Sequence, residues 1–287
     1  MKKILVTGCN GQLGRAINTE YANEEVEFIN TDVAESEGVV ALDITDIEHV
    51  LEVVHDTKPD VIINCAAHTA VDLCEAQFET AYKINAIGAR NLSIAATDVG
   101  AKLIHVSTDY VFDGEGNIPY TEFDQTGPNS AYGKTKLVGE NFVKEFAHKY
   151  FIIRTAWLYG EGKNFVNTML RLSETNKVVR VVGDQFGTPT SAKELAKMIH
   201  HLEPTKNYGL FHGTCEGSCT WAEFAEEIFR LTNKRTGVEV ITTKEYPTPA
   251  SRPAFAILDN LMLRLSTNFK MADWRDALKE YIDEMPK

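Results

Sequence analysis

The chain has 287 residues, of which 44% are hydrophobic and 24% charged, a composition typical of a globular protein with a sizeable core. Its formal net charge of −12 argues against nucleic acid and anionic membrane surfaces as partners, and an anionic substrate would need a local basic pocket. No apolar run reaches the roughly 18 residues of a transmembrane helix, and the N-terminus carries no signal-peptide cleavage site, so we expect a cytoplasmic protein.

The cysteines fit the same compartment. They are odd in number and show neither a CxxC pair nor the Cys/His spacing of a zinc site. We expect reduced, structural thiols at Cys9, Cys65, Cys74, Cys215 and Cys219.

Apolar strands alternate with segments of helical period through the first half of the chain. This alternation predicts βαβ units and therefore a parallel sheet. The strands are expected at residues 3–7, 26–32, 60–64, 102–107 and 151–155, and the helices at residues 12–21, 46–57, 79–99 and 129–148.

The second half is less regular and is interrupted by Gly and Pro, apart from a helix expected near residues 273–284. The predicted fold class is therefore α/β, a Rossmann-type doubly wound parallel sheet with a smaller C-terminal substrate-binding lobe. Residues 1–163 are expected to form the dinucleotide-binding domain. Residues 164–287 are expected to form mainly the substrate lobe, interleaved with late strands of the main sheet.

A glycine-rich loop, Gly8-Cys-Asn-Gly11-Gln-Leu-Gly14, joins the first expected strand to the first expected helix. Glycine permits the tight turn and lets a pyrophosphate approach the amides at the positive end of the helix. The spacing is GxxGxxG, and its position between strand and helix favours dinucleotide binding over a purely structural turn. The candidate cofactor contacts here are Gly8, Asn10, Gly11, Gln12, Leu13 and Gly14.

Asp32 ends the second expected strand, about 20 positions after the loop, where an acidic side chain can bind a ribose hydroxyl. Its charge would repel a 2′-phosphate, and Val33 offers no basic partner, although Arg15 is near enough to offset the repulsion. The pattern favours NAD(H), with NADP(H) as the alternative.

Tyr132 and Lys136 are four residues apart on the helix expected at residues 129–148, and so share one face. A nearby ammonium is expected to lower the pKa of the phenol and help it donate a proton to a carbonyl oxygen. Tyr159 and Lys163 have the same spacing, but Gly160 and Gly162 between them should prevent a helix. Spacing alone would also fit a solvated surface pair.

Thr108 is a further candidate residue for the same site. It follows the strand expected at residues 102–107, at the carboxyl end where ligands bind in parallel sheets, and its hydroxyl can donate a hydrogen bond to a carbonyl oxygen. A glycine loop, a strand-end hydroxyl and a helical Tyr/Lys pair in this order predict a ketone reductase with Thr108, Tyr132 and Lys136 as catalytic residues.

With these motifs the chain resembles the extended short-chain dehydrogenase/reductase superfamily, and within it the dTDP-4-dehydrorhamnose reductase family. The resemblance covers nearly the whole length. It rests on TGCNGQLG, NCAAHTAVDLCE, KINAIGARNL, STDYVFDG, YGKTK, RTAWLYG and DQFGTPTSAKELA.

The resemblance implies NAD(P)H-dependent reduction of the 4-keto group of dTDP-4-dehydro-6-deoxy-L-mannose to dTDP-L-rhamnose. Lys136 would also bind the nicotinamide ribose. Further cofactor contacts implied are Asp43 and Ile44 near the adenine, and Ala66, Ala67, His68 and Asn85. Substrate contacts implied are Val71, Asp109, Tyr110, Trp157 and Arg252.

Related activities remain as alternatives. A dehydratase of the superfamily would need a Glu after the aspartate, but Tyr110 follows Asp109. Another sugar-nucleotide reductase, an epimerase, or a regulatory subunit of the methionine adenosyltransferase type stays open. The sequence has no HExxH metal motif, and His200, His201 and His212 fit surface or core positions. The resemblance allows a homodimer, with Mg²⁺ at a subunit contact.

Overall fold

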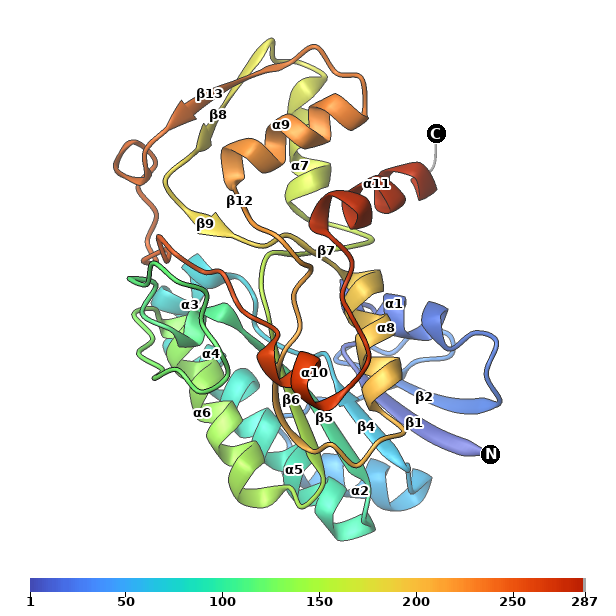
Figure 1. Ribbon diagram of the computed structural model, residues 1–287. Coiled ribbons are helices and arrows are strands. Elements are labelled where there is room, and N and C mark those ends of the chain that lie inside the picture. Colours follow the sequence, from blue (N-terminus) through green and yellow to red (C-terminus); the bar gives the residue numbers. More distant parts are fainter. Residues whose placement is uncertain (286–287) are drawn as a thin grey trace.

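Seven parallel strands form one sheet in the computed structural model, which describes residues 1–285 (Figure 1). The strand order is β11–β6–β5–β4–β1–β2–β3, and each neighbouring pair runs parallel. The inner strands are apolar almost throughout because helices cover both faces of the sheet. The strands are β1 (Lys2–Thr7), β2 (Val26–Asp32), β3 (Val40–Ala41), β4 (Val61–Asn64), β5 (Lys102–Thr108), β6 (Tyr150–Thr155) and β11 (Gly209–His212).

Two layers of helices complete the doubly wound fold. On one face, α1 (Gln12–Glu20) packs on α8 (Ala192–Leu202), and their apolar residues share one core with β1, β4 and β6. On the other face lie α2 (Ile47–Thr57), α5 (Gly88–Val99) and α6 (Ala131–Phe146). The chain winds outward from β1 in one direction and from β4 in the other, so the topological switch point, where such sheets bind ligands, lies between these two strands.

A smaller lobe with its own apolar core stands above the carboxyl ends of the strands (Figure 1). Two short pairings, of β7 with β10 and of β9 with β12, lie between this lobe and the sheet. The lobe and its connections comprise β7 (Leu158–Tyr159), α7 (Phe165–Ser173), β8 (Val178–Val182), β9 (Phe186–Gly187), β10 (Thr190–Ser191), β12 (Cys219–Thr220), α9 (Trp221–Leu231), β13 (Gly237–Ile241) and α11 (Trp274–Glu284).

The predicted doubly wound α/β fold is confirmed, with small changes at helix ends. Ser130 and Asp46 are N-caps that lie just outside their helices, because their side chains accept hydrogen bonds from first-turn amides. The single helix predicted over residues 79–99 was wrong in detail. It consists of α4 (Phe78–Tyr82), a π-helical turn (Lys83–Ile87) and α5, preceded by the separate short helix α3 (Val71–Ala76).

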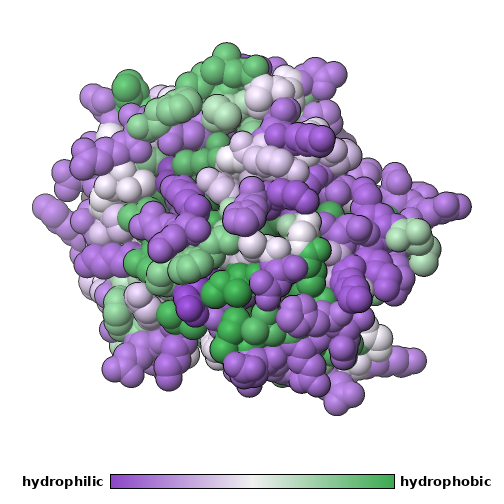
Figure 2. All heavy atoms as spheres, turned by 90° about the horizontal axis from the view of Figure 1, so that it is seen from below, coloured by the Kyte–Doolittle hydropathy of each residue, from purple (hydrophilic) through white to green (hydrophobic). Residues whose placement is uncertain are grey.

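Seen from below, away from the smaller lobe, the surface is mostly hydrophilic, with apolar patches between the polar groups (Figure 2). Within residues 1–285, no helix is both long and apolar enough to cross a membrane. The last short helix, α10 (Leu261–Ser266), packs against β11 at the edge of the sheet.

Candidate active site

A cavity of about 1010 Å³ lies at the carboxyl ends of the central strands, between the sheet and the smaller lobe. Its wall includes the glycine loop, the ends of β2, β4, β5 and β6, and the first residues of α6. The lobe contributes Trp157, Lys163, Asn164 and Trp221. The cavity therefore joins the expected cofactor loop to the expected catalytic residues.

The glycine loop fits a dinucleotide for steric reasons. Gly8 has a φ of +63°, and a Cβ there would lie 2.8 Å from the backbone N of Ala66. A Cβ on Gly14 would lie 2.5 Å from the carbonyl oxygen of Gly8, so α1 can start close to the loop only with glycine at that position. Gly11 caps α1 without a side-chain hydrogen bond, which leaves the positive end of the helix open to a phosphate.

Asp32 lies on the cavity wall together with Asp43 and Ile44. Its carboxylate accepts hydrogen bonds from the backbone N–H groups of Asn10 (3.1 Å) and Val33 (2.8 Å), which fixes it beside the glycine loop. Among the described residues, Arg15 forms no ion pair with Asp32. The Arg15 guanidinium donates to the carbonyl oxygen of Asn10 at 2.9 Å and pairs with Glu161.

Four of the expected contacts support the wall without forming it. Ala66 and Ala67 line the cavity, but Asn10, His68, Asn85 and Arg252 are not among its lining residues. The Asn85 side chain accepts a hydrogen bond from the backbone N–H of His68 at 2.8 Å and donates to the Thr135 hydroxyl at 3.1 Å. Asn85 therefore ties the π-helical turn to the segment after β4 and to α6, a positioning role.

Thr108, Tyr132 and Lys136 all lie on the cavity wall. Lys136 is 2% exposed, and its ammonium donates to the carbonyl oxygen of Val106 at 2.6 Å. Burial lowers the pKa of Lys136 to about 8, against a smaller opposite effect of Glu140. The lysine is held at the end of β5, one helical turn from the tyrosine.

The expected lowering of the Tyr132 pKa is not found. Burial raises the pKa of the phenol, and the Thr108 hydroxyl opposes that rise only in part. The Lys136 ammonium is directed to the Val106 carbonyl oxygen. A phenol that keeps its proton suits donation to a carbonyl oxygen, which is the direction of a reduction.

A buried ion pair fixes α6, the helix that carries Tyr132 and Lys136, on the sheet. Glu140, one turn after Lys136, makes two hydrogen bonds with Arg154 of β6, at 2.8 and 2.7 Å. It also accepts a hydrogen bond from the Ser107 hydroxyl at 2.6 Å. Hydrogen bonds from Arg154 and Ser107 outweigh burial and keep the pKa of Glu140 below its ordinary value. Ser107 precedes Thr108, so this network sets the position of α6 relative to the strand end.

Asp109 is buried and follows Thr108 in the chain. Its carboxyl accepts a hydrogen bond from the Thr108 hydroxyl at 2.8 Å, and burial raises its pKa to about 7. Val71, Tyr110 and Trp157 line the same part of the cavity. The Tyr110 ring meets Tyr132 edge-on, with ring centroids 5.5 Å apart.

The lobe closes the cavity with a pair of stacked indoles. Trp157 and Trp221 have ring centroids 3.5 Å apart and planes 10° apart. Trp157 has a φ of +46°, an uncommon backbone conformation for a bulky residue. Sequence reasoning missed Trp221, which comes from a segment with no motif around it, and it considered Lys163 only as a partner of Tyr159.

Arg252 lies outside the wall, where it forms an ion pair with Asp72 of α3 at 2.7 Å and donates to the Tyr110 hydroxyl at 3.2 Å. These contacts connect the loop after β13 to the sheet domain. Among residues 1–285, no group of three or more His, Cys, Asp or Glu side chains could hold a metal ion.

A family model described as the RmlD substrate binding domain matches residues 1–286. A dTDP-4-dehydrorhamnose reductase of Escherichia coli (strain K12) is 39% identical over 255 residues, which are 85% of each chain. The chain belongs to the dTDP-4-dehydrorhamnose reductase family. The resemblance predicted from the sequence motifs is thereby confirmed. A spore coat polysaccharide biosynthesis protein, SpsK of Bacillus subtilis (strain 168), is 38% identical and covers 99% of this chain and 98% of its own.

Solved structures of the family superpose closely. A dTDP-4-dehydrorhamnose reductase of Clostridium acetobutylicum is 54% identical, with a TM-score of 0.94 over 98% of both chains. One from Bacillus anthracis, solved in complex with NADP, is 42% identical with a TM-score of 0.94 over 99% of this chain and 100% of its own. A UDP-glucose 4-epimerase of Thermus thermophilus, 18% identical with a TM-score of 0.83, covers 98% of both chains and shares the fold.

Proposed function

We propose that this protein is an oxidoreductase that reduces the 4-keto group of dTDP-4-dehydro-6-deoxy-L-mannose to dTDP-L-rhamnose with NAD(P)H. One observation carries the proposal: Thr108, Tyr132 and Lys136 share one cavity with the glycine loop at the switch point of the sheet. Membership of the reductase family supports the choice of substrate. The reaction would belong to the biosynthesis of nucleotide sugars for cell-surface polysaccharides.

The chain's own residues supply the polar part of the reaction. The bound dinucleotide supplies a hydride to the sugar carbon. Tyr132 holds its phenolic proton because burial raises its pKa, and gives that proton to the carbonyl oxygen as negative charge develops there. The Thr108 hydroxyl donates to Asp109 in this structure and would turn its one proton to the same oxygen when the substrate binds, and Lys136 would bind the nicotinamide ribose.

Asp32 supports NADH as the preferred cofactor, with NADPH as the weaker one. Its carboxylate is fixed on the cavity wall where a ribose hydroxyl can bind, and the guanidinium of Arg15 is engaged by Glu161. A 2′-phosphate would therefore meet a negative charge without a nearby unpaired arginine. The ratio of kcat/KM for the two cofactors tests this preference.

We assign residues 1–163 to the cofactor domain and residues 164–287 mainly to a substrate-binding lobe. Val71, Asp109, Tyr110 and Trp157 would surround the sugar, and Arg252 would stand near the diphosphate. Support comes from the cavity, which Val71, Asp109, Tyr110 and Trp157 line, while Arg252 lies outside the wall and donates a hydrogen bond to Tyr110. Tyr110 after Asp109 provides no second carboxylate for the elimination that a dehydratase performs.

Cellular location and assembly belong to the proposal as well. All five cysteines are free thiols, which supports the cytoplasm as the location. A homodimer is the expected assembly by resemblance, and light scattering of the purified protein would measure it. The residues described here do not group into a Mg²⁺ site within one chain, so no step of the reaction is derived through a metal.

The test compares the wild-type protein with Tyr132→Phe. This change removes the phenolic hydroxyl and keeps the ring, so NADH should bind with unchanged affinity while kcat falls by about 100-fold or more. Fluorescence titration measures the binding, and loss of absorbance at 340 nm measures turnover. Full activity of Tyr132→Phe would show that another group donates the proton.

A further inference from the structure

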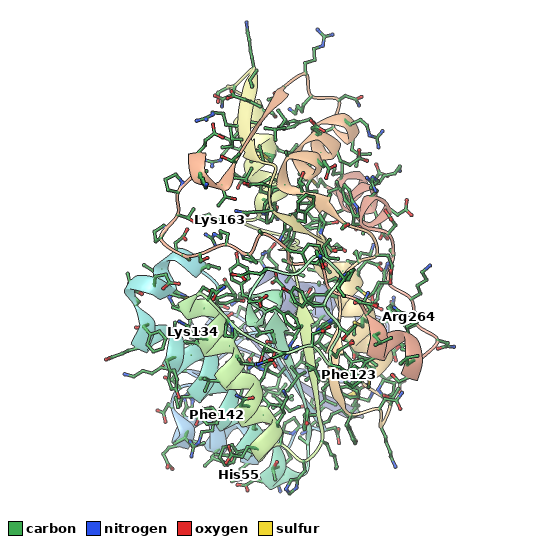
Figure 3. The ribbon with its side chains drawn as sticks, turned by 60° about the vertical axis from the view of Figure 1, so that its left-hand side comes forward. His55, Phe123, Lys134, Phe142, Lys163 and Arg264 are labelled. Atoms are coloured by element: carbon green, nitrogen blue, oxygen red, sulfur yellow. The ribbon has the colours of Figure 1, made fainter. Side chains whose placement is uncertain are left out.

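Lys163 is an exposed cation on the wall of the cavity. Figure 3 shows it at the junction of the smaller lobe with the sheet domain. Among residues 1–285, no carboxylate lies within 4.0 Å of its ammonium, whereas Arg15 is paired with Glu161 and Arg252 with Asp72. An unpaired ammonium facing a cavity in a chain of net charge −12 is a candidate for binding an anion.

The segment that carries Lys163 is held rigidly. Asn164 donates from its side chain to the carbonyl oxygen of Gly160 at 2.5 Å, and Asn167 donates to that of Gly162 at 2.6 Å. The Tyr281 hydroxyl, from α11, donates to the carbonyl oxygen of Gly160 at 2.8 Å. The backbone at Lys163 therefore has a defined position relative to the cavity.

The same segment lies against the start of α1. A Cβ built on Gly160 would lie 3.4 Å from the Cβ of Gln12, the first residue of that helix. The ion pair of Arg15 with Glu161 makes a second connection between α1 and this segment. Lys163 thus comes from the part of the smaller lobe that touches the glycine loop, where the amides of α1 can receive a diphosphate.

Two other cations near the cavity are engaged. The ammonium of Lys136 is bonded to the Val106 carbonyl oxygen, and Arg252 is paired with Asp72 and lies outside the wall. Lys83 is a second exposed cation on the wall without an ion pair among the described residues, but it belongs to the π-helical turn that packs on α6 and not to the segment against α1.

We propose that Lys163 is a diphosphate-binding residue that reaches from the smaller lobe over the N-terminus of α1. Its ligand is the diphosphate of a nucleotide, either the one within the dinucleotide cofactor or the one that carries the sugar. The proposal rests on the proposed function for the identity of these two nucleotides. Lysine acts on a phosphate as a compact point charge, so its contribution should depend on charge and on salt.

Binding without turnover tests the proposal, with NADH and dTDP as separate probes. Lys163→Ala should weaken one of them by about fivefold to tenfold at low salt, and less at high salt, because added ions screen an exposed contact. Lys163→Arg should retain most of the affinity, and Lys163→Glu should lose more than Lys163→Ala. The probe that is weakened identifies the source of the diphosphate.

Lys234→Ala, an exposed lysine in the loop after α9, is the matched control and should bind both probes as the wild-type protein does. Thermal unfolding of all variants should be unchanged, since Lys163 makes no ion pair or hydrogen bond within the described residues. Wild-type affinity of Lys163→Ala and Lys163→Glu for both probes would overturn the proposal, as would a larger loss in Lys83→Ala. Neither result depends on whether the keto sugar is reduced, so this proposal and the proposed function can fail separately.

Discussion

Lys136 is a buried charge that the fold retains at an energetic cost. Burial moves its pKa from 10.5 to about 8. That difference corresponds to about 3 kcal/mol that the charged form loses on folding at neutral pH. The side chain is 2% exposed, so solvent screening does little to reduce this figure.

We therefore predict that Lys136→Met changes the pH dependence of stability. Between pH 8 and pH 10.5 the unfolded wild-type chain holds a proton at Lys136 that the folded chain has released, so wild-type stability rises with pH through this window. The variant lacks the group. Relative to the variant, the wild-type free energy of unfolding should gain about 3 kcal/mol across the window. The lost hydrogen bond to Val106 shifts the difference by a constant amount and leaves its pH dependence unchanged.

Urea denaturation at a series of pH values between 7 and 10.5, followed by circular dichroism, measures the difference. Lys134→Met is the matched control, because Lys134 is an exposed lysine on the same helix (Figure 3). A lysine that stays in solvent on folding should give no such trend. If the stabilities of Lys136→Met and Lys134→Met followed the same pH dependence, the lowered pKa of a buried Lys136 would be refuted.

Three further changes probe the same site. Asp109→Asn should show the opposite pH trend to Lys136→Met, because burial raises the Asp109 pKa to about 7. The wild-type free energy of unfolding, relative to that of the variant, should fall as the pH rises from 3.8 to 7. Equal differences at pH 4.5 and pH 7.5, measured by urea denaturation, would contradict this. Glu140→Gln leaves Arg154 buried without its partner and should lower the free energy of unfolding by about 3–5 kcal/mol, whereas a loss below about 1 kcal/mol would mean the pair contributes little. Thr108→Val should lower kcat by about 100-fold with unchanged affinity for NADH, and a change in affinity alone would remove the threonine from the reacting oxygen.

The main sheet, the glycine loop and the three candidate catalytic residues could be predicted because the patterns that indicate them are local in sequence. Three glycines between a strand and a helix predict the function of the glycine loop. Gly8 adopts the φ of +63° that the tight turn needs. Tyr132 and Lys136 share a helix, so their spacing alone predicts a shared face. Thr108 follows from its position at a strand end.

The lobe side of the cavity could not be predicted, because its residues meet only after the chain folds back. Trp221 begins α9 and stacks on Trp157, 64 positions earlier, and no motif around Trp221 indicates the contact. The partner of Arg252 is Asp72, which is 180 positions away. The expected lowering of the Tyr132 pKa failed because burial of the phenol raises it, and the extent of burial depends on packing that the Tyr132–Lys136 spacing does not show.

The π-helical turn at Lys83–Ile87 was missed because the apolar pattern of residues 79–99 continues through it. One extra residue per turn changes which side chains face the sheet without interrupting the pattern. Asn85 lies within this turn and bonds to both His68 and Thr135, so the irregular turn positions a residue that supports the site.

The central claim is that this cavity reduces a 4-keto sugar with a nicotinamide cofactor. The most direct measurement is absorbance at 340 nm with NADH or NADPH and freshly prepared dTDP-4-dehydro-6-deoxy-L-mannose. We predict loss of reduced cofactor that depends on the substrate and equals, mole for mole, the dTDP-L-rhamnose formed, with NADH used more efficiently than NADPH. No oxidation by a protein that demonstrably binds the cofactor would contradict the assigned reaction.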